Sequence, residues 1–552
     1  MTERFSQLAT SSRGLRFDPW VIGAIVLAVL VLSPVVSIAW IAFHPVENIW
    51  PHLWATVLPR YLATTLWLML GVAVLAAGMG VGAAWLVTLY RFPGRDWLAY
   101  ALLFPLAIPA YVGAYALVDL MDYGGPVQTG LREAFGWQST RDYWFPETRS
   151  LWAAILVLAL ALYPYVYLMA RAAYREQSGG TYEVARALGA GPWSMFWRIG
   201  LPLARPAIAA GLALVLMETV ADYGAVYHFG VQTLTTGVFT TWLNDGNAGG
   251  AAQIAGIILM LILVLVGLER AGRGRARFHG PARNRRPISR QELRGPGRWL
   301  AMLACLLPFV GGFLLPVGVM LYHSAKAPEG WLAPGLGTAL VNTLVVGAGA
   351  AVATVAAALV LVYALRQSRS RALGWILPLT LIGYAAPGAV LALGLLFPLA
   401  ALDHRLADGL LALTGHDPGL MITGTALGLG IAYLVRFFGI AQGALDSAYG
   451  RVSPVLSMAA RSLGKSAGGA LTAVYVPLMR GSVATALMVV FVDCVKELPA
   501  TLLLRPFNYN TLSTRVYELA SLERLSEAAP AALLVMAVGL SAVALLARGQ
   551  RD

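Results

Sequence analysis

The feature that most limits the fold of this chain is a series of apolar stretches, each long enough to cross a lipid bilayer. A helix needs about 20 apolar residues to span the hydrocarbon layer, and it satisfies its own backbone hydrogen bonds there. Of the 552 residues, 58% are hydrophobic and only 12% are charged, too few charges for the surface of a water-soluble protein of this length. The sequence therefore predicts an all-α polytopic membrane protein with about twelve spans. The expected spans are 20–43, 62–90, 98–119, 151–174, 206–227, 252–268, 299–322, 339–365, 373–399, 420–441, 481–504 and 530–547.

The connections between these spans alternate in charge. Arginine and lysine gather in the loops at 91–95, 175–205, 366–371 and 451–480, and most densely in the linker at 269–298. The loops between them are poor in basic residues or mixed. By the positive-inside rule, the basic loops and both termini are expected in the cytoplasm. The net charge of +13 follows this alternation, so it does not indicate nucleic-acid binding.

A short polar stretch occurs twice in this apolar chain. The sequence EVARALG at 183–189, followed by IGLP at 199–202, recurs more weakly as MAARSLG at 458–464, followed by VYVP at 474–477. The offset is 275 residues for the glycine (464 − 189) and for the proline (477 − 202). A repeat that keeps its register indicates a structural device used twice.

Two further sequence pairs extend the repeat over both halves. ATTL at 63–66 resembles VNTL at 341–344, and LAIP at 106–109 resembles YAAP at 384–387. About six spans per half, an even number, predict parallel halves related by a pseudo-twofold axis along the membrane normal. The expected domains are 1–268 and 299–552, and the linker at 269–298, rich in Arg, Gly and Pro, is expected to be a flexible solvated tether.

The repeated polar stretch falls between the fourth and fifth spans of each half, on the expected cytoplasmic side. Its pattern, Glu183-x-Ala185-x3-Gly189 followed by the IGLP at 199–202, resembles the EAA loop of ABC-transporter membrane subunits. In that family the loop forms a short coupling helix that docks into a cleft on the nucleotide-binding subunit. The first copy departs at Val184, which replaces the central alanine, and the second has Met458 in place of the glutamate. The coupling residues that the resemblance implies are Glu183, Ala185, Arg186, Gly189, Pro202, Met458, Ala459, Ala460, Gly464 and Pro477.

Local physical chemistry predicts how such a loop folds. Thr181 is a candidate N-cap, and Glu183 would favour the positive end of a short helix. Ala185 is small enough to let a partner approach closely, and Gly189 can end the helix.

The segments after each coupling loop restrict the resemblance to a smaller group of ABC-transporter membrane subunits. ADYGAV at 221–226 with FGVQTLTTG at 229–237, and KELPATLLLRP at 496–506 with TLSTRVY at 511–517, are similar to the fused two-domain permeases of ferric-iron ABC importers. This implies two tandem six-helix domains with coupling loops near 175–205 and 444–480, in the bacterial inner membrane and surrounded by its lipid.

The same resemblance implies how the protein works. A periplasmic binding protein would deliver Fe³⁺, and two cytoplasmic ATPase subunits would use ATP and Mg²⁺. The chain itself would bind no cofactor and no nucleic acid. Thiamine permeases share the fused layout, so thiamine is the alternative ligand. Permeases for polyamines and for the oxyanions sulfate and molybdate are more distant relatives.

Several charged residues fall inside the expected spans. Glu218 and Asp222 lie four residues apart, which predicts a shared helix face, and Asp493 and Glu497 occupy the corresponding positions 275 residues later. Charges at this depth are costly and usually face a cavity or a partner. The hypothesis is a carboxylate-lined path between the halves, whose hard oxygen atoms suit a hard trivalent cation without holding it tightly. The alternative is a structural network in which Lys496 neutralises an acid. The candidate pathway residues are Glu218, Asp222, Tyr223, Asp493, Lys496 and Glu497.

Other chemistries fit the sequence less well. LGKS at 463–466 resembles the end of a P-loop, but Ala459 replaces its first glycine and no strand precedes it, so ATP hydrolysis is expected in separate subunits. Cys305 and Cys494 lie in apolar stretches and are expected to be packing residues. A secondary transporter driven by an ion gradient would explain the intramembrane acids but not the paired loops. A membrane-embedded enzyme would require a nucleophile–base or metal constellation, which the sequence does not suggest.

Overall fold

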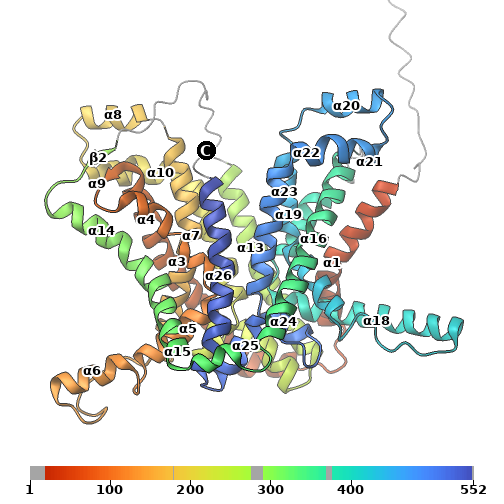
Figure 1. The fold of residues 1–552 in the computed structure, drawn as a ribbon, viewed down its shortest axis with the longest axis horizontal. Coiled ribbons are helices and arrows are strands. Elements are labelled where there is room, and N and C mark those ends of the chain that lie inside the picture. Colours follow the sequence, from red (N-terminus) through yellow and green to blue (C-terminus); the bar gives the residue numbers. More distant parts are fainter. Residues whose placement is uncertain (1–18, 178, 275–289, 368–373, 375, 550–552) are drawn as a thin grey trace, which may run out of the picture.

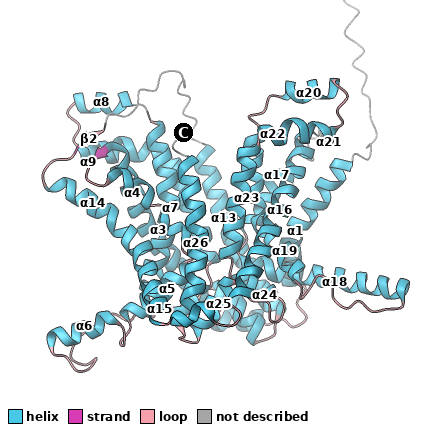
Figure 2. Cartoon of the chain, in the orientation of Figure 1, coloured by secondary structure: helices cyan, strands magenta, loops and turns pink. Residues whose placement is uncertain are grey.

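The computed structural model describes residues 19–177, 179–274, 290–367, 374 and 376–549. Ten of its helices are long and apolar enough to cross a membrane, and the number rises to twelve if each of two bent helix pairs is one span. This confirms the all-α polytopic fold. The bundle divides into two arms toward the end that carries α8 (Gly179–Ala187) and α20 (Pro454–Ser462), one on each arm (Figures 1 and 2).

The helices follow one another in a similar order in the two halves. The remaining helices before residue 275 are α1 (Pro19–Phe43), α2 (Trp50–Thr56), α3 (Leu58–Leu89), α4 (Arg95–Ala101), α5 (Ala110–Met121), α6 (Pro126–Phe135), α7 (Leu151–Glu176), α9 (Pro192–Met195), α10 (Leu201–Ala221), α11 (Gly224–His228), α12 (Leu234–Phe239) and α13 (Ala248–Gly274). After residue 290 they are α14 (Pro296–Phe309), α15 (Leu315–Lys326), α16 (Leu336–Gln367), α17 (Ile376–Ala385), α18 (Gly388–Thr414), α19 (Ala426–Tyr449), α21 (Ala467–Ala470), α22 (Val476–Leu478), α23 (Arg480–Lys496), α24 (Pro499–Leu504), α25 (Leu512–Ser521) and α26 (Leu525–Gly549).

The repeated threonines have the same structural task in each half. The hydroxyl oxygen of Thr65 accepts the backbone amide of Leu234 at 3.0 Å, and that of Thr343 accepts the amide of Leu512 at 2.8 Å. These amides belong to the first residues of α12 and α25, both of which begin with a threonine capping box. Each repeated hydroxyl therefore satisfies a buried helix-start donor that would otherwise be unpaired.

The first helix of each half crosses to the other half. α1 packs against α16, α17 and α18, and its Ala24 and Val31 lie in the core of the second half. In return, α14 packs against α3 and α4, and its buried Cys305 lies in the core of the first half. Small residues permit this closeness, since a Cβ atom on Gly394 would lie 2.4 Å from the carbonyl oxygen of Pro34. The halves are interlocked, unlike two bundles that merely face each other.

Four expected spans are wrong as continuous helices. The third and ninth are interrupted at Pro109 and Pro387, where the backbone is extended; at Pro109 the flanking helices bend by 95°. The residue before a proline avoids the helical conformation, and proline lacks the amide hydrogen that a helix interior needs. The fifth and eleventh end at Ala221 and Lys496, and a short helix follows each.

The ends of the expected linker are ordered. α13 continues to Gly274, whereas residues 275–289 lie outside the described residues. Beyond them, β2 (Gln291–Glu292) pairs in parallel with β1 (Tyr90–Arg91), and the amide of Leu293 donates to the carbonyl of Arg91 at 3.1 Å. The far end of the linker is thus attached to the first half, which differs from the expected free tether.

Candidate translocation pathway and coupling surfaces

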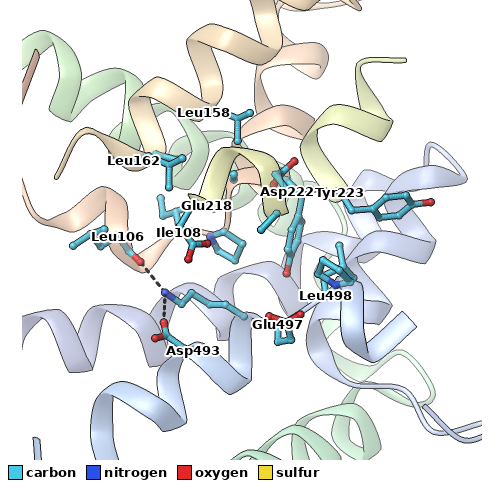
Figure 3. A pocket seen from close by; sticks show the side chains of 18 of the residues that line it. Leu106, Ile108, Leu158, Leu162, Glu218, Asp222, Tyr223, Asp493, Glu497 and Leu498 are labelled. Atoms are coloured by element: carbon cyan, nitrogen blue, oxygen red, sulfur yellow. Dashed lines mark hydrogen bonds and ion pairs between the residues drawn. The ribbon is translucent and has the colours of Figure 1, made fainter. Parts of the chain in front are cut away.

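One cavity between the halves brings together all six candidate pathway residues. It has a volume of about 160 Å³ and is lined by α10 and α11 of the first half and by α19, α23 and α24 of the second (Figure 3). The start of α5, at Pro109 to Tyr111, and the α7 residues Leu158, Ala161, Leu162 and Tyr165 also line it. The sequence repeat therefore places two corresponding helix breaks against each other at the interface.

Two of the cavity acids explain why their helices end. The carboxylate of Asp222 accepts the backbone amides of Ala225 and Val226 at 3.0 and 3.1 Å, at the start of α11. Correspondingly, Glu497 accepts the amide of Ala500 at 3.1 Å, at the start of α24. A carboxylate at a helix start pairs with free amides and with the positive end of the helix dipole. Asp222 and Glu497 therefore have a structural role, and Glu218 and Asp222 do not share one continuous helix.

Two cations neutralise part of the cavity. The ammonium of Lys496 lies 3.1 Å from a carboxylate oxygen of Asp493 and donates to the carbonyl of Leu106 in the first half at 3.3 Å (Figure 3). The guanidinium of Arg436 lies 3.8 Å from the carboxylate of Glu497, and both side chains are 8% exposed. These two ion pairs agree with part of the alternative hypothesis, in which the charged residues form a structural network and Lys496 neutralises an acid.

Arg436 was missed by the sequence reasoning. It is a single charge inside the apolar stretch expected at 420–441, and it lines the cavity from α19. Its guanidinium also donates to the carbonyl of Ala386, beside the break between α17 and α18. The rule that selected Glu218, that a charge within a membrane helix faces a cavity or partner, would have selected Arg436 too.

Glu218 differs from the other three acids. It lies on the last turn of α10 and lines the cavity, and no other described residue gives its carboxylate a hydrogen bond or an ion pair within 4 Å. Arg436 and Lys496 act on it only at longer range. With four acids and two bases, the cavity carries a formal excess of negative charge. Within the described ranges, no group of three or more His, Cys, Asp or Glu side chains could hold a metal ion.

Tyr223 points away from these charges (Figure 3). Its ring stacks on Phe239, with the ring centres 3.7 Å apart, and its hydroxyl lies 3.3 Å from that of Tyr517. Tyr223 therefore lines the cavity, as expected of a candidate pathway residue, but its hydroxyl does not join the carboxylates. Tyr223 instead forms an aromatic contact across the two halves.

The two copies of the EAA-like stretch form matching short helices. α8 and α20 are followed by Gly189 and Gly464, both at φ +83°, a conformation that glycine adopts without strain. The amide of Ala190 returns to the carbonyl of Ala185 at 2.9 Å, and that of Lys465 to Ala460 at 3.1 Å. These bonds are those of a Schellman helix end. Further along each copy, Pro202 and Pro477 occupy the second position of α10 and of α22, respectively.

The outer faces of these helices carry uncovered apolar side chains. Leu188 is 82% exposed and Leu463, its counterpart, is 84% exposed, while Val184 and Met458 are also exposed. Two local expectations are wrong. Thr181 is not an N-cap because α8 begins at Gly179, and Ala185 does not face a partner because it is buried in the core of the first half. The coupling role itself stays a prediction.

Comparison with known proteins identifies the class. Residues 74–270 match the family model described as "Binding-protein-dependent transport system inner membrane component". Over these residues, about a third of the chain, it is similar to permease subunits of this family, and it is a multi-pass inner-membrane protein with a transport role.

Individual relatives differ in how much of the chain they match. The chain is 26% identical over 487 residues to the Fe(3+)-transport system permease protein FbpB 2 of Haemophilus influenzae, which covers 86% of this chain and 87% of that protein. It is 29% identical over 213 residues to the molybdenum transport system permease protein ModB of Escherichia coli K12, covering 36% of this chain and 87% of ModB. Against the sulfate transport system permease protein CysT of E. coli K12 it is 29% identical over 194 residues, or 34% of this chain and 66% of CysT.

Proposed function

We propose that this permease imports ferric iron. The observation that carries the proposal is the similarity to FbpB 2, which runs through both halves, whereas those to ModB and CysT cover about a third of the chain. The cavity supports it, because hard carboxylate oxygens in excess over bases suit a hard trivalent cation. Glu218 is the cavity acid whose carboxylate has no hydrogen bond or ion pair to a described residue, so it would contact the passing ligand while Asp222 and Glu497 hold the helix breaks in place.

The partners follow from the two exposed short helices. Two ATPase subunits would bind α8 and α20, one each, and cover Leu188 and Leu463. These subunits would hydrolyse ATP with Mg²⁺, and a binding protein would deliver the ligand at the opposite end of the bundle. The N-terminal end of α1 and the C-terminal end of α26 lie toward the α8 and α20 end (Figure 1), so both termini would be cytoplasmic.

The arrangement supports an alternating-access mechanism. When the ATPase subunits close, α8 and α20 would approach each other and the two arms would pivot about the opposite end. The contacts that cross the halves would then change, above all the bond from Lys496 to the carbonyl of Leu106. Because α1 packs in the second half and α14 in the first, each arm would carry one helix of the other half as it moves.

The test is reconstitution in liposomes with the cognate binding protein and ATPase. ATP hydrolysis would be measured with the binding protein loaded with ferric iron, thiamine, sulfate or molybdate in turn. Ferric iron should give the largest stimulation over the unloaded binding protein. Stimulation by thiamine or an oxyanion alone would contradict the iron assignment while retaining the importer class.

A further inference from the structure

A second and larger cavity lies at the α8 end of the first half, away from the proposed pathway. Its volume is about 750 Å³. It is open to the surface and is lined by α4, the last turns of α3, α7 and α26, and the residue that precedes β2. The charged and aromatic residues that line it are Arg95, Asp96, Trp97, Tyr100, Phe104, Arg171, Arg175 and Arg290.

Two of the four arginines that line the cavity are held by hydrogen bonds or ion pairs to described residues, and the other two have no such bond to a carbonyl or carboxylate. Arg171 is buried, donates to the carbonyl of Ala99 at 2.8 Å and lies over the ring of Tyr100. Arg95 donates to the carbonyl of Val87 at 2.7 Å and pairs with Asp96. Among the described residues, neither Arg175 nor Arg290 has a carboxylate or carbonyl partner within hydrogen-bond distance.

The cavity is strongly positive. Asp96 is its single acid, and that carboxylate is already engaged by Arg95. Burial and the like charges of Arg95, Arg91 and Arg175 lower the pKa of the Arg290 guanidinium, although Asp96 acts in the opposite direction. An anion placed between these arginines would relieve that repulsion.

We propose that this cavity binds a phosphate group, that of an anionic phospholipid headgroup. Guanidinium groups form paired hydrogen bonds to phosphate oxygens, and Arg175 and Arg290 have no carboxylate or carbonyl partner among the residues that the structure describes. Basic pockets between membrane helices at the cytoplasmic side bind anionic headgroups, and Trp97, Phe104 and Ala544 provide an apolar wall for the glycerol and the first acyl carbons.

The linker gives this site a structural consequence. The pairing of β2 with β1 places Arg290 beside α4 and α7, so a bound headgroup would join the returning linker to the first half. The proposal does not depend on which ligand the permease transports.

The test is lipid binding to the purified full-length chain, followed by native mass spectrometry. After delipidation, the chain would be titrated with phosphatidylglycerol and, separately, with phosphatidylcholine, which carries no net charge. The variant R175Q/R290Q removes the two arginines that have no carboxylate or carbonyl partner in the described part of the chain. R205Q/R480Q is the matched control, since it removes the same charge from two exposed corresponding positions outside the cavity.

The wild type should bind phosphatidylglycerol at least about tenfold more tightly than phosphatidylcholine. At roughly 1 kcal/mol for each arginine near the headgroup, R175Q/R290Q should lose about thirtyfold in phosphatidylglycerol affinity, and the control should lose little. Inorganic phosphate should not displace phosphatidylglycerol. If the chain binds inorganic phosphate directly but binds both lipids equally, the cavity is a phosphate site for a soluble ligand and not for a lipid. Equal binding of both lipids without phosphate binding, or an R175Q/R290Q variant that binds like the wild type, would overturn the proposal.

Discussion

Replacing Glu218 with glutamine should impair transport while leaving the fold intact. Its carboxylate has no hydrogen bond or ion pair to another described residue, so the neutral side chain leaves no buried partner unpaired. Asp222→Ala should behave differently, because it leaves the amides of Ala225 and Val226 without their acceptor. The loss of such a helix cap costs about 0.5–2 kcal/mol of stability.

The size of the effect on transport follows from the cavity. A volume of about 160 Å³ corresponds to a radius of roughly 3 Å, which would place a central cation about 5 Å from the Glu218 carboxylate. At an effective dielectric constant of about 20, each unit of ligand charge at that distance contributes about 3 kcal/mol, or about a hundredfold in binding. Mobile water and counter-charges reduce this value, so we expect a fall of at least about tenfold in uptake at subsaturating ligand.

The assay is initial uptake into liposomes that contain the permease, its ATPase and the loaded binding protein, together with thermal unfolding of each variant. Glu133→Gln on α6 is the matched control, because Glu133 is an exposed acid outside the cavity. Wild-type uptake by Glu218→Gln would refute the role of this carboxylate in the pathway. A large loss of thermal stability in Glu218→Gln would show instead that the acid belongs to the structural network.

Three further substitutions distinguish effects on the stability of the fold from effects on coupling between ATP hydrolysis and transport. Arg436→Met should lower stability by about 3–5 kcal/mol because it leaves the carboxylate of Glu497 buried without its cation, and the double variant Arg436→Met/Glu497→Gln should recover part of that loss in thermal unfolding. Gly189→Ala should strain the end of α8 by about 1 kcal/mol and reduce ligand-stimulated ATP hydrolysis more than it reduces folding; unchanged stimulation would argue against coupling through α8. Glu183→Ala should impair transport more than Met458→Ala, since only the first copy carries the acid, and equal losses would contradict this asymmetry.

Much of the fold follows from local sequence patterns. The apolar stretches locate the long helices because a membrane helix is defined by its own length and composition. The register of the repeat predicts which residues of the two halves adopt the same local structure. Gly189 and Gly464, 275 residues apart, have the same positive φ. Thr65 and Thr343 could be recognised as corresponding residues, but their shared task depends on amides 169 residues away and is visible only in the structure.

The elements that sequence reasoning missed depend on contacts between distant segments. The crossing of α1 to the second half leaves no signal, because an apolar side chain facing lipid and one facing another helix are alike in a single sequence. The helix end at Ala221 depends on Asp222 capping the next helix, and the same residues could have continued as one helix. Arg436 carried a local signal, yet its pairing with Glu497 is a tertiary contact.

The most direct test of the proposed transport function is the accumulation of ferric iron in liposomes that contain the permease with its ATPase and binding protein. Accumulation should require hydrolysable ATP and all three components, and it should continue when ionophores for protons and for sodium collapse the ion gradients. Accumulation that proceeds without the ATPase and stops when the gradient collapses would contradict this function and assign the chain to ion-coupled transport.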